Sequence, residues 1–268
     1  MLDTERRTEH EREAQRLAAA VREAGAVALK TFRGTVKSWT KGKDSPVCEA
    51  DIAVNELLHE RLSGAEFGWL SEESIDDPQR LAARRVWVVD PIDGTRAYLA
   101  GLPDWTIAAA LVEDGRPVAA AIYAPVTDEL FTATAGGGAQ CNGLAMTATL
   151  GDALDGARLS GPRRYLERLQ EARPAIVLTP RVHSLALRFT RVAQGALDAA
   201  MATANSHDWD LAAADLLVHE AGGLLTTFSG RELTYNQADT KHEPLVAAGR
   251  ERHEQLIGLV QARRIAFV

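Results

Sequence analysis

The sequence predicts a layered α/β protein with two subdomains, and its pattern of elements carries this prediction. Helical periodicity dominates the N-terminal stretch, apolar runs of strand length fill the middle, and strands then alternate with helices. The chain has 268 residues, 46% hydrophobic and 25% charged, which is typical of a globular protein of one large domain or two interlocked parts. We expect an N-terminal α+β subdomain over residues 1–155 and a C-terminal α/β subdomain over residues 156–268.

Two helices are predicted near the N-terminus. Over residues 3–32, apolar side chains recur mostly four apart, while arginine and glutamate fill the other positions. A loop or short hairpin rich in glycine and lysine follows over residues 33–46. The second helix begins near Glu49, with Glu49 and Asp51 in its first turn, where the helix dipole favours acidic side chains.

The middle of the chain changes to strands that form one antiparallel sheet. Asp114 and Gly115 are placed to make a tight hairpin turn between two apolar runs. The predicted strands cover residues 85–90, 105–112, 117–124 and 129–135, with a short helix over 95–101. In the last part we expect strands over residues 174–179, 195–201, 222–228 and 244–249, and helices over 183–194, 210–221 and 250–264.

Composition excludes several classes of protein. Lysine and arginine number 30 against 37 aspartates and glutamates, and the net charge of −7 argues against a nucleic-acid polymer as partner. No apolar run approaches the ~18 residues of a membrane span, and the charged N-terminus lacks the apolar core of a secretory signal. The two cysteines are too few for a disulfide framework. We therefore expect a cytoplasmic protein.

The segment VVDPIDGT, residues 88–95, is the first candidate site. Asp90 and Asp93 lie three residues apart on a tight turn after an apolar strand, with the Ile92 carbonyl between them. Gly94 and Thr95 then begin a short helix, whose free N–H groups could hold a phosphate. The alternative is an ordinary aspartate turn that caps a helix.

Other acidic residues have plausible structural roles when each is taken alone. Glu72, beside Glu73, could be a solvated surface charge, and Asp210 and Asp51 could be helix caps. If the fold brings these three together with Asp90 and Asp93, each pair at ~5 Å repels by roughly 3 kcal/mol at an effective dielectric of ~20. Such a cluster would change its protonation or move apart unless cations fill it, and its oxygen-only ligands favour Mg²⁺ or Mn²⁺ over Zn²⁺.

Together these segments resemble the metal-dependent phosphatase superfamily that includes inositol monophosphatase, 3'(2'),5'-bisphosphate nucleotidases and fructose-1,6-bisphosphatase. The likeness is greatest to the inositol monophosphatase family and extends from residue 46 to residue 223. The resemblance implies an αβαβα sandwich of the sugar-phosphatase type and a lithium-sensitive phosphoric monoester hydrolase. It also implies a homodimer and two or three bound Mg²⁺ ions, with Mn²⁺ as a possible substitute.

The resemblance also implies a set of metal ligands. Glu72, Asp90 and the Ile92 carbonyl would hold a first magnesium, and Asp90, Asp93 and Asp210 would hold a second. A third, weaker ion would involve Glu72 and Asp51 through water. Asp210 would also lie against the substrate.

The same resemblance assigns catalytic roles to three further groups. Thr95 would hydrogen-bond the attacking water, Asp51 would orient or deprotonate that pair, and Glu72, a metal ligand, also counts among the catalytic residues. The amides of Gly94 and Thr95 would contact the phosphate. One departure is Cys48, where the family often has threonine, and a small packed residue is the better interpretation of this cysteine than a nucleophile.

For the substrate we expect a small sugar-alcohol phosphate such as inositol 1-phosphate, cleaved by direct in-line attack of metal-activated water. The segment GTRAYLAGLPDW is also similar to histidinol-phosphate phosphatases, and IYAPV to bisphosphate nucleotidases, so both activities remain alternatives. A non-catalytic domain that binds metal or phosphate is a rival from another class. The candidate pocket residues are Arg96, Arg181, His183, Ser184, His207 and Asp208.

Overall fold

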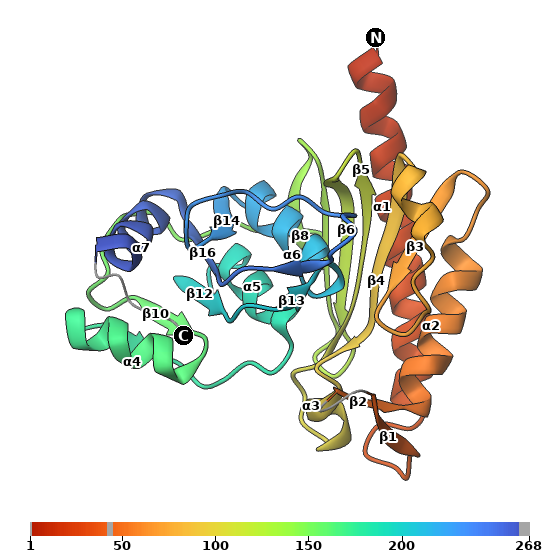
Figure 1. Ribbon diagram of the computed structural model, residues 1–268, viewed down its shortest axis with the longest axis horizontal. Coiled ribbons are helices and arrows are strands. Elements are labelled where there is room, and N and C mark those ends of the chain that lie inside the picture. Colours follow the sequence, from red (N-terminus) through yellow and green to blue (C-terminus); the bar gives the residue numbers. More distant parts are fainter. Residues whose placement is uncertain (1, 42–44, 263–268) are drawn as a thin grey trace.

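A computed structural model describes residues 2–41 and 45–262, in which layers of helices alternate with two main sheets (Figure 1). Each main sheet is covered by helices on both faces, and one pair of helices lies between the two sheets. This confirms the αβαβα sandwich. The middle of the predicted loop, residues 42–44, and the last two residues of the predicted C-terminal helix lie outside the described residues.

The outer helices α1 (Leu2–Leu29) and α2 (Glu49–Leu62) cover one face of the larger sheet. Its neighbouring strands, in order, are β3 (Phe67–Ser71), β4 (Arg85–Asp93), β5 (Thr106–Glu113), β6 (Arg116–Ala124), β7 (Glu129–Thr134), β8 (Gly138–Cys141) and β9 (Leu144–Ala145). Successive β4 residues face opposite layers: Trp87 and Val89 pack with α1 and α2, and Val86 and Val88 pack toward the central helices. The strand is therefore apolar throughout.

From β4 to β9 the larger sheet is antiparallel, as predicted, while β3 pairs parallel to β4. The hairpin between β5 and β6 turns at Asp114 and Gly115, whose φ angles are 50° and 78°. Two consecutive left-handed residues make the turn that matches strand twist, which explains the Asp-Gly pair.

The central helices are α5 (Leu185–Ala193) and α6 (Asp208–Glu220), and they separate the two sheets. The second sheet has the order β11 (Val177–Leu178), β10 (Arg158–Ser160), β12 (Ala199–Ala202), β16 (Leu245–Gly249) and β14 (Gly223–Thr227). Its outer face is covered by α4 (Arg163–Ala172) and α7 (Arg250–Ala262) through residues such as Tyr165 and Leu256.

The smaller elements at the end of the larger sheet where the acidic turn is found are the hairpin β1 (Ser38–Lys41) and β2 (Ser45–Cys48), the short helix α3 (Thr95–Leu99), and the pair β13 (Ser206–His207) and β15 (Lys241–His242). The 3₁₀ helix η1 (Pro78–Ala82) lies near the opposite end, close to the turn at Asp114 and Gly115. No helix within the described ranges is long and apolar enough to cross a membrane.

The structure differs from the sequence predictions at several elements, among them the strands β3 and β10, which were not predicted. The first helix ends at Leu29 rather than at residue 32, and the strand expected over 174–179 is reduced to the two-residue edge strand β11. Helix α4 was not predicted. The chain passes from the larger to the second sheet between β9 and β10, where the proposed boundary at 155/156 falls, and the division into two interlocked subdomains stays a prediction.

Candidate active site

Three of the predicted carboxylates meet at one point. Asp90, Asp93 and Asp210 each offer an oxygen atom, and these atoms lie within 4.8 Å of one another. The first two residues end β4, and Asp210 lies in the first turn of α6, which packs against the larger sheet. Residues far apart in the sequence therefore form one acidic cluster.

Local backbone irregularity brings the two β4 aspartates to the same side. The ladder between β4 and β5 shifts between Asp90 and Asp93, which removes the strict alternation of a regular strand. Gly94 follows in the left-handed region at φ 95°, and a Cβ there would lie 3.3 Å from the Ser184 nitrogen. Only glycine fits this turn without strain, and it allows α3 to begin at Thr95.

The cluster lines a cavity of about 180 Å³. The predicted metal-ligating, catalytic and phosphate-contacting residues are collected in its wall, with the exception of Asp51. The wall consists of Pro46, Glu72, Asp90, Ile92, Asp93, Gly94, Thr95, Arg96, Arg181, His183 and Asp210. A cavity of this size accommodates a phosphate group and its immediate neighbours.

Asp51 lies directly behind Thr95. The Thr95 hydroxyl oxygen is 3.1 Å from Asp51 Oδ1 and 3.0 Å from the Ile92 carbonyl oxygen. The other Asp51 oxygen accepts a hydrogen bond of 2.8 Å from the Cys48 backbone N–H. Cys48 is fully buried, and burial raises the pKa of its thiol to about 12, so it is a packed residue as predicted.

The negative charge of the carboxylate cluster is not fully compensated by hydrogen bonds within the protein. Burial, together with neighbouring carboxylates, raises the pKa of Glu72 to about 7 and holds the pKa values of Asp90 and Asp210 well above their usual range. Asp90 Oδ1 is buried without a hydrogen-bond partner. Converging oxygen ligands with an unsatisfied buried carboxylate oxygen fit a hard divalent cation.

Asp93 has a support that was not predicted. Its carboxylate accepts hydrogen bonds from the Ser184 hydroxyl at 2.5 Å, the Leu185 N–H at 3.1 Å and the Ala186 N–H at 2.6 Å. Ser184 also caps α5 by accepting from the Leu187 N–H. The sequence analysis placed Ser184 in the substrate pocket, whereas in the structure its hydroxyl holds the candidate metal ligand Asp93 in place. Its position before an apolar helix was the available signal.

The other pocket candidates divide into two groups. Arg96, Arg181 and His183 line the cavity, and His183 Nδ1 lies 2.7 Å from an oxygen of Asp104. His207 and Asp208 do not line it, so their assignment to the cavity was wrong.

Both of these residues support the loop structure around α6 instead. The His207 backbone N–H donates to Asp210 Oδ2 at 2.7 Å and orients that carboxylate. Asp208 is buried, accepts from the Asn236 N–H, and lies 2.7 Å from His242 Nε2.

Glu72 and Glu73 are both partly buried, which contradicts the alternative of a solvated acidic pair. Lys41, on β1, forms an ion pair with Glu73 and donates to the Glu72 carbonyl oxygen at 3.1 Å. The hairpin β1–β2 thus fixes the backbone that carries Glu72 at the end of β3.

The family model of the inositol monophosphatase family matches residues 3–264. The chain belongs to the inositol monophosphatase family. Two curated relatives are Nus factor SuhB of Escherichia coli (strain K12), 32% identical over 79% of this chain and 83% of its own length, and an inositol-1-monophosphatase of Rhizobium meliloti (strain 1021). The latter is 33% identical over 71% of this chain and 75% of its own length.

Solved structures agree with this family assignment. The extragenic suppressor protein suhB from Bartonella henselae superposes with a TM-score of 0.82 at 27% identity, covering 94% of this chain and 98% of that one. The protein is accordingly an enzyme of the phosphomonoesterase class.

Proposed function

We propose that this enzyme hydrolyses a phosphorylated small molecule with Mg²⁺ as cofactor, and that sugar-alcohol phosphates such as inositol 1-phosphate are substrates. The observation that carries the proposal is the convergence of Asp90, Asp93 and Asp210 around an unsatisfied buried carboxylate oxygen. A relative 33% identical to this chain carries the name inositol-1-monophosphatase, which supports the substrate class.

The ligand set accommodates more than one cation. Glu72, Asp90 and the Ile92 carbonyl would hold one ion, and Asp90, Asp93 and Asp210 a second; a third is proposed near Glu72 and Asp51. When bound, the ions neutralise phosphate oxygens, lower the pKa of water and stabilise the leaving alkoxide. Oxygen-only ligands suit Mg²⁺, and Mn²⁺ is the expected substitute.

The chain's own residues position the nucleophile and the phosphate. Because the Thr95 hydroxyl directs its proton toward Asp51 or the Ile92 carbonyl, its lone pair is free to accept a hydrogen bond from the attacking water. As water attacks in line, Thr95 Oγ1 takes the water's proton and passes its own proton to Asp51 Oδ1. The N–H groups of Gly94 and Thr95, at the start of α3, would contact the phosphate.

Phosphate release in the presence of Mg²⁺ tests this function. A panel of inositol 1-phosphate, adenosine 3',5'-bisphosphate, histidinol phosphate and fructose 1,6-bisphosphate compares the proposed and alternative substrates. We expect release from inositol 1-phosphate that EDTA abolishes and lithium inhibits. Saturable thermal stabilisation by Mg²⁺ without release from any substrate would instead support a non-catalytic binding domain.

Two further properties remain proposals. We propose a homodimer, which sedimentation velocity at micromolar concentration would detect as a species of twice the chain mass. The cytoplasmic setting predicted from the sequence is tested by cell fractionation.

A further inference from the structure

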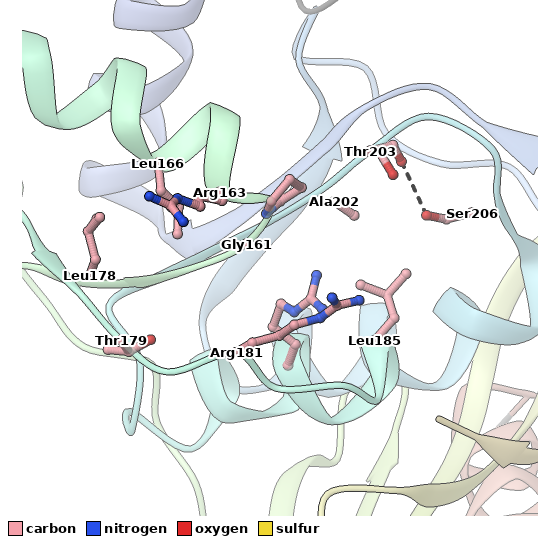
Figure 2. A pocket seen from close by; sticks show the side chains of 12 residues that line it. Gly161, Arg163, Leu166, Leu178, Thr179, Arg181, Leu185, Ala202, Thr203 and Ser206 are labelled. Carbon is pink, nitrogen blue, oxygen red and sulfur yellow. Dashed lines mark hydrogen bonds between the residues drawn. The ribbon is translucent and has the colours of Figure 1, made fainter. Parts of the chain in front are cut away.

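A second and larger cavity adjoins the catalytic one. Its volume is about 740 Å³, and Figure 2 shows it between the start of α4, the β11–α5 segment and the end of β12. Arg181 lines both cavities, so they share a wall. The residues around the larger cavity are Gly161, Pro162, Arg163, Leu166, Leu178, Thr179, Arg181, Leu185, Arg188, Ala202, Thr203 and Ser206.

This lining combines positive and apolar side chains, and Figure 2 shows Arg163 beside Leu166. It holds three arginines and no acidic residue, in a chain whose net charge is −7 and beside a cavity rich in carboxylates. Leu166, Leu178 and Leu185 supply an apolar surface. The two neighbouring cavities therefore differ in the sign of their charge.

The three arginines differ in what they bind. The Arg188 guanidinium donates to the Val182 and Met201 carbonyl oxygens, so it supports the backbone. Arg163 has a side chain 90% exposed and pairs with Glu167 at 2.7 Å.

Arg181 differs from both. It is exposed, and it has no hydrogen bond or ion pair with any residue that the structure describes. In Figure 2 its side chain extends into the open space opposite Gly161.

We propose that the larger cavity binds the part of the substrate remote from the reacting phosphate, and that Arg181 recognises a second anionic group there. This proposal rests on the hydrolytic function above. The catalytic cavity of about 180 Å³ lies below the roughly 300–1,000 Å³ of typical ligand pockets, whereas the larger cavity of about 740 Å³ falls within that range.

The chemistry of the lining defines the ligand class. A guanidinium matches a phosphate or carboxylate through paired hydrogen bonds, and the leucines match an apolar ring or chain. A neutral polyol would use neither feature. The preferred substrate is therefore a phosphomonoester with an apolar body and a second phosphate or carboxylate.

Two substrates that differ only in the second anion provide the test. For the wild type we expect kcat/KM for adenosine 3',5'-bisphosphate to exceed that for adenosine 3'-monophosphate about tenfold, mainly through KM, because one hydrogen bond to a charged group has about that value. Arg181→Gln should bring this ratio close to one, and Arg181→Lys should retain part of it. Arg7→Gln, which removes an exposed arginine of α1 that lines neither cavity, is the control and should change the ratio by less than about twofold.

A second pair, 3-phosphoglycerate and glycerol 3-phosphate, asks whether a carboxylate replaces the second phosphate; a preference that depends on Arg181 in either pair supports the proposal. If neither pair shows such a preference, or if Arg7→Gln lowers the ratio as much as Arg181→Gln, the proposal is wrong while hydrolysis of inositol 1-phosphate still stands. If no monoester is hydrolysed, the proposed function fails. In that case, the affinity of uncleaved adenosine 3',5'-bisphosphate is measured by calorimetry with Mg²⁺ present, which tests the role of Arg181 independently of hydrolysis. Equal affinities for the wild type and Arg181→Gln would overturn the inference.

Discussion

The two aspartates of the β4 turn have opposite hydrogen-bond environments. The Asp93 carboxylate accepts three hydrogen bonds from the α5 region, whereas Asp90 Oδ1 is buried and accepts none. A charge that the protein itself does not compensate destabilises the fold until a cation binds. Substitution by asparagine should therefore affect stability differently at the two positions.

Asp90→Asn is expected to lower kcat at least about 1,000-fold while the protein stays folded, because a shared metal ligand loses its charge. Without metal, its melting temperature should be equal to or above that of the wild type, since one repelling charge is removed. Asp93→Asn should also lose activity, but it should melt lower, because its amide group opposes the donors around it. Phosphate release and thermal unfolding with and without Mg²⁺ measure both effects. Retention of a tenth of the activity by Asp90→Asn would contradict the assigned role.

The sequence indicated the candidate metal ligands, but it did not indicate which residues hold those ligands in place. Asp90 and Asp93 could be paired from their spacing on one turn, and the wider cluster from a resemblance in motifs. The bond from Ser184 to Asp93 spans 91 residues, and no local pattern identifies its acceptor. The cavity around Arg181 likewise arises only where α4, β12 and the β11–α5 segment meet.

At the scale of elements, the start of α2 links helix stability to the site. Cys48 is the N-cap residue: its sulfur accepts from the Asp51 N–H, while its own N–H donates to the Asp51 carboxylate. This capping box both begins the helix and positions the residue behind Thr95. Cys48 stands where the resemblance leads us to expect threonine, and it retains the cap because its sulfur can still accept a hydrogen bond, although weakly.

Two isosteric variants of this cap separate hydrogen bonding from packing. Cys48→Val removes the side-chain acceptor and should lower the free energy of unfolding by about 1 kcal/mol relative to Cys48→Thr, which retains one. Urea unfolding at constant Mg²⁺ measures the difference. Equal midpoints for the two variants would show that the side chain contributes no capping energy.

Local periodicity does not separate the elements that were predicted from those that were missed, because the missed helix α4 is strongly amphipathic. Helix α4 buries Tyr165, Leu166 and Leu169 on one face, its remaining positions are mostly charged, and the sequence analysis assigned no element to this segment. Strand β10 has three residues and is defined by its parallel neighbours rather than by its composition. The apolar run at 174–179 pairs over two residues only, because it lies at the edge of the sheet.

At the scale of the whole molecule, a buried histidine makes the folded state less stable at acidic pH. His253 of α7 lies 2.9 Å from the Thr226 hydroxyl of β14, and burial lowers the pKa of this histidine to about 4. Because the unfolded value is near 6.5, the contribution to stability is complete above pH 6.5 and is lost as the pH falls to 4. The melting temperature should fall over this window, and His253→Gln should fall less steeply. Parallel curves for the two proteins would contradict the assignment.

The carboxylate cluster should give stability the opposite pH dependence, so that stability falls as the pH rises, and it should do so only in the absence of metal. Burial raises the folded pKa values of Glu72, Asp90 and Asp210 above their unfolded values, so their protonated forms stabilise the fold at low pH. That contribution is lost as the pH rises through the folded values, about 7 for Glu72. In EDTA we therefore expect the melting temperature to fall by about 5 °C or more between pH 6 and pH 8.5. Saturating Mg²⁺ should remove most of this fall because it binds the ionised form, and Asp90→Asn in EDTA should show a shallower one. An equal slope in EDTA and in Mg²⁺ would mean that the acidic residues are compensated within the protein and need no cation.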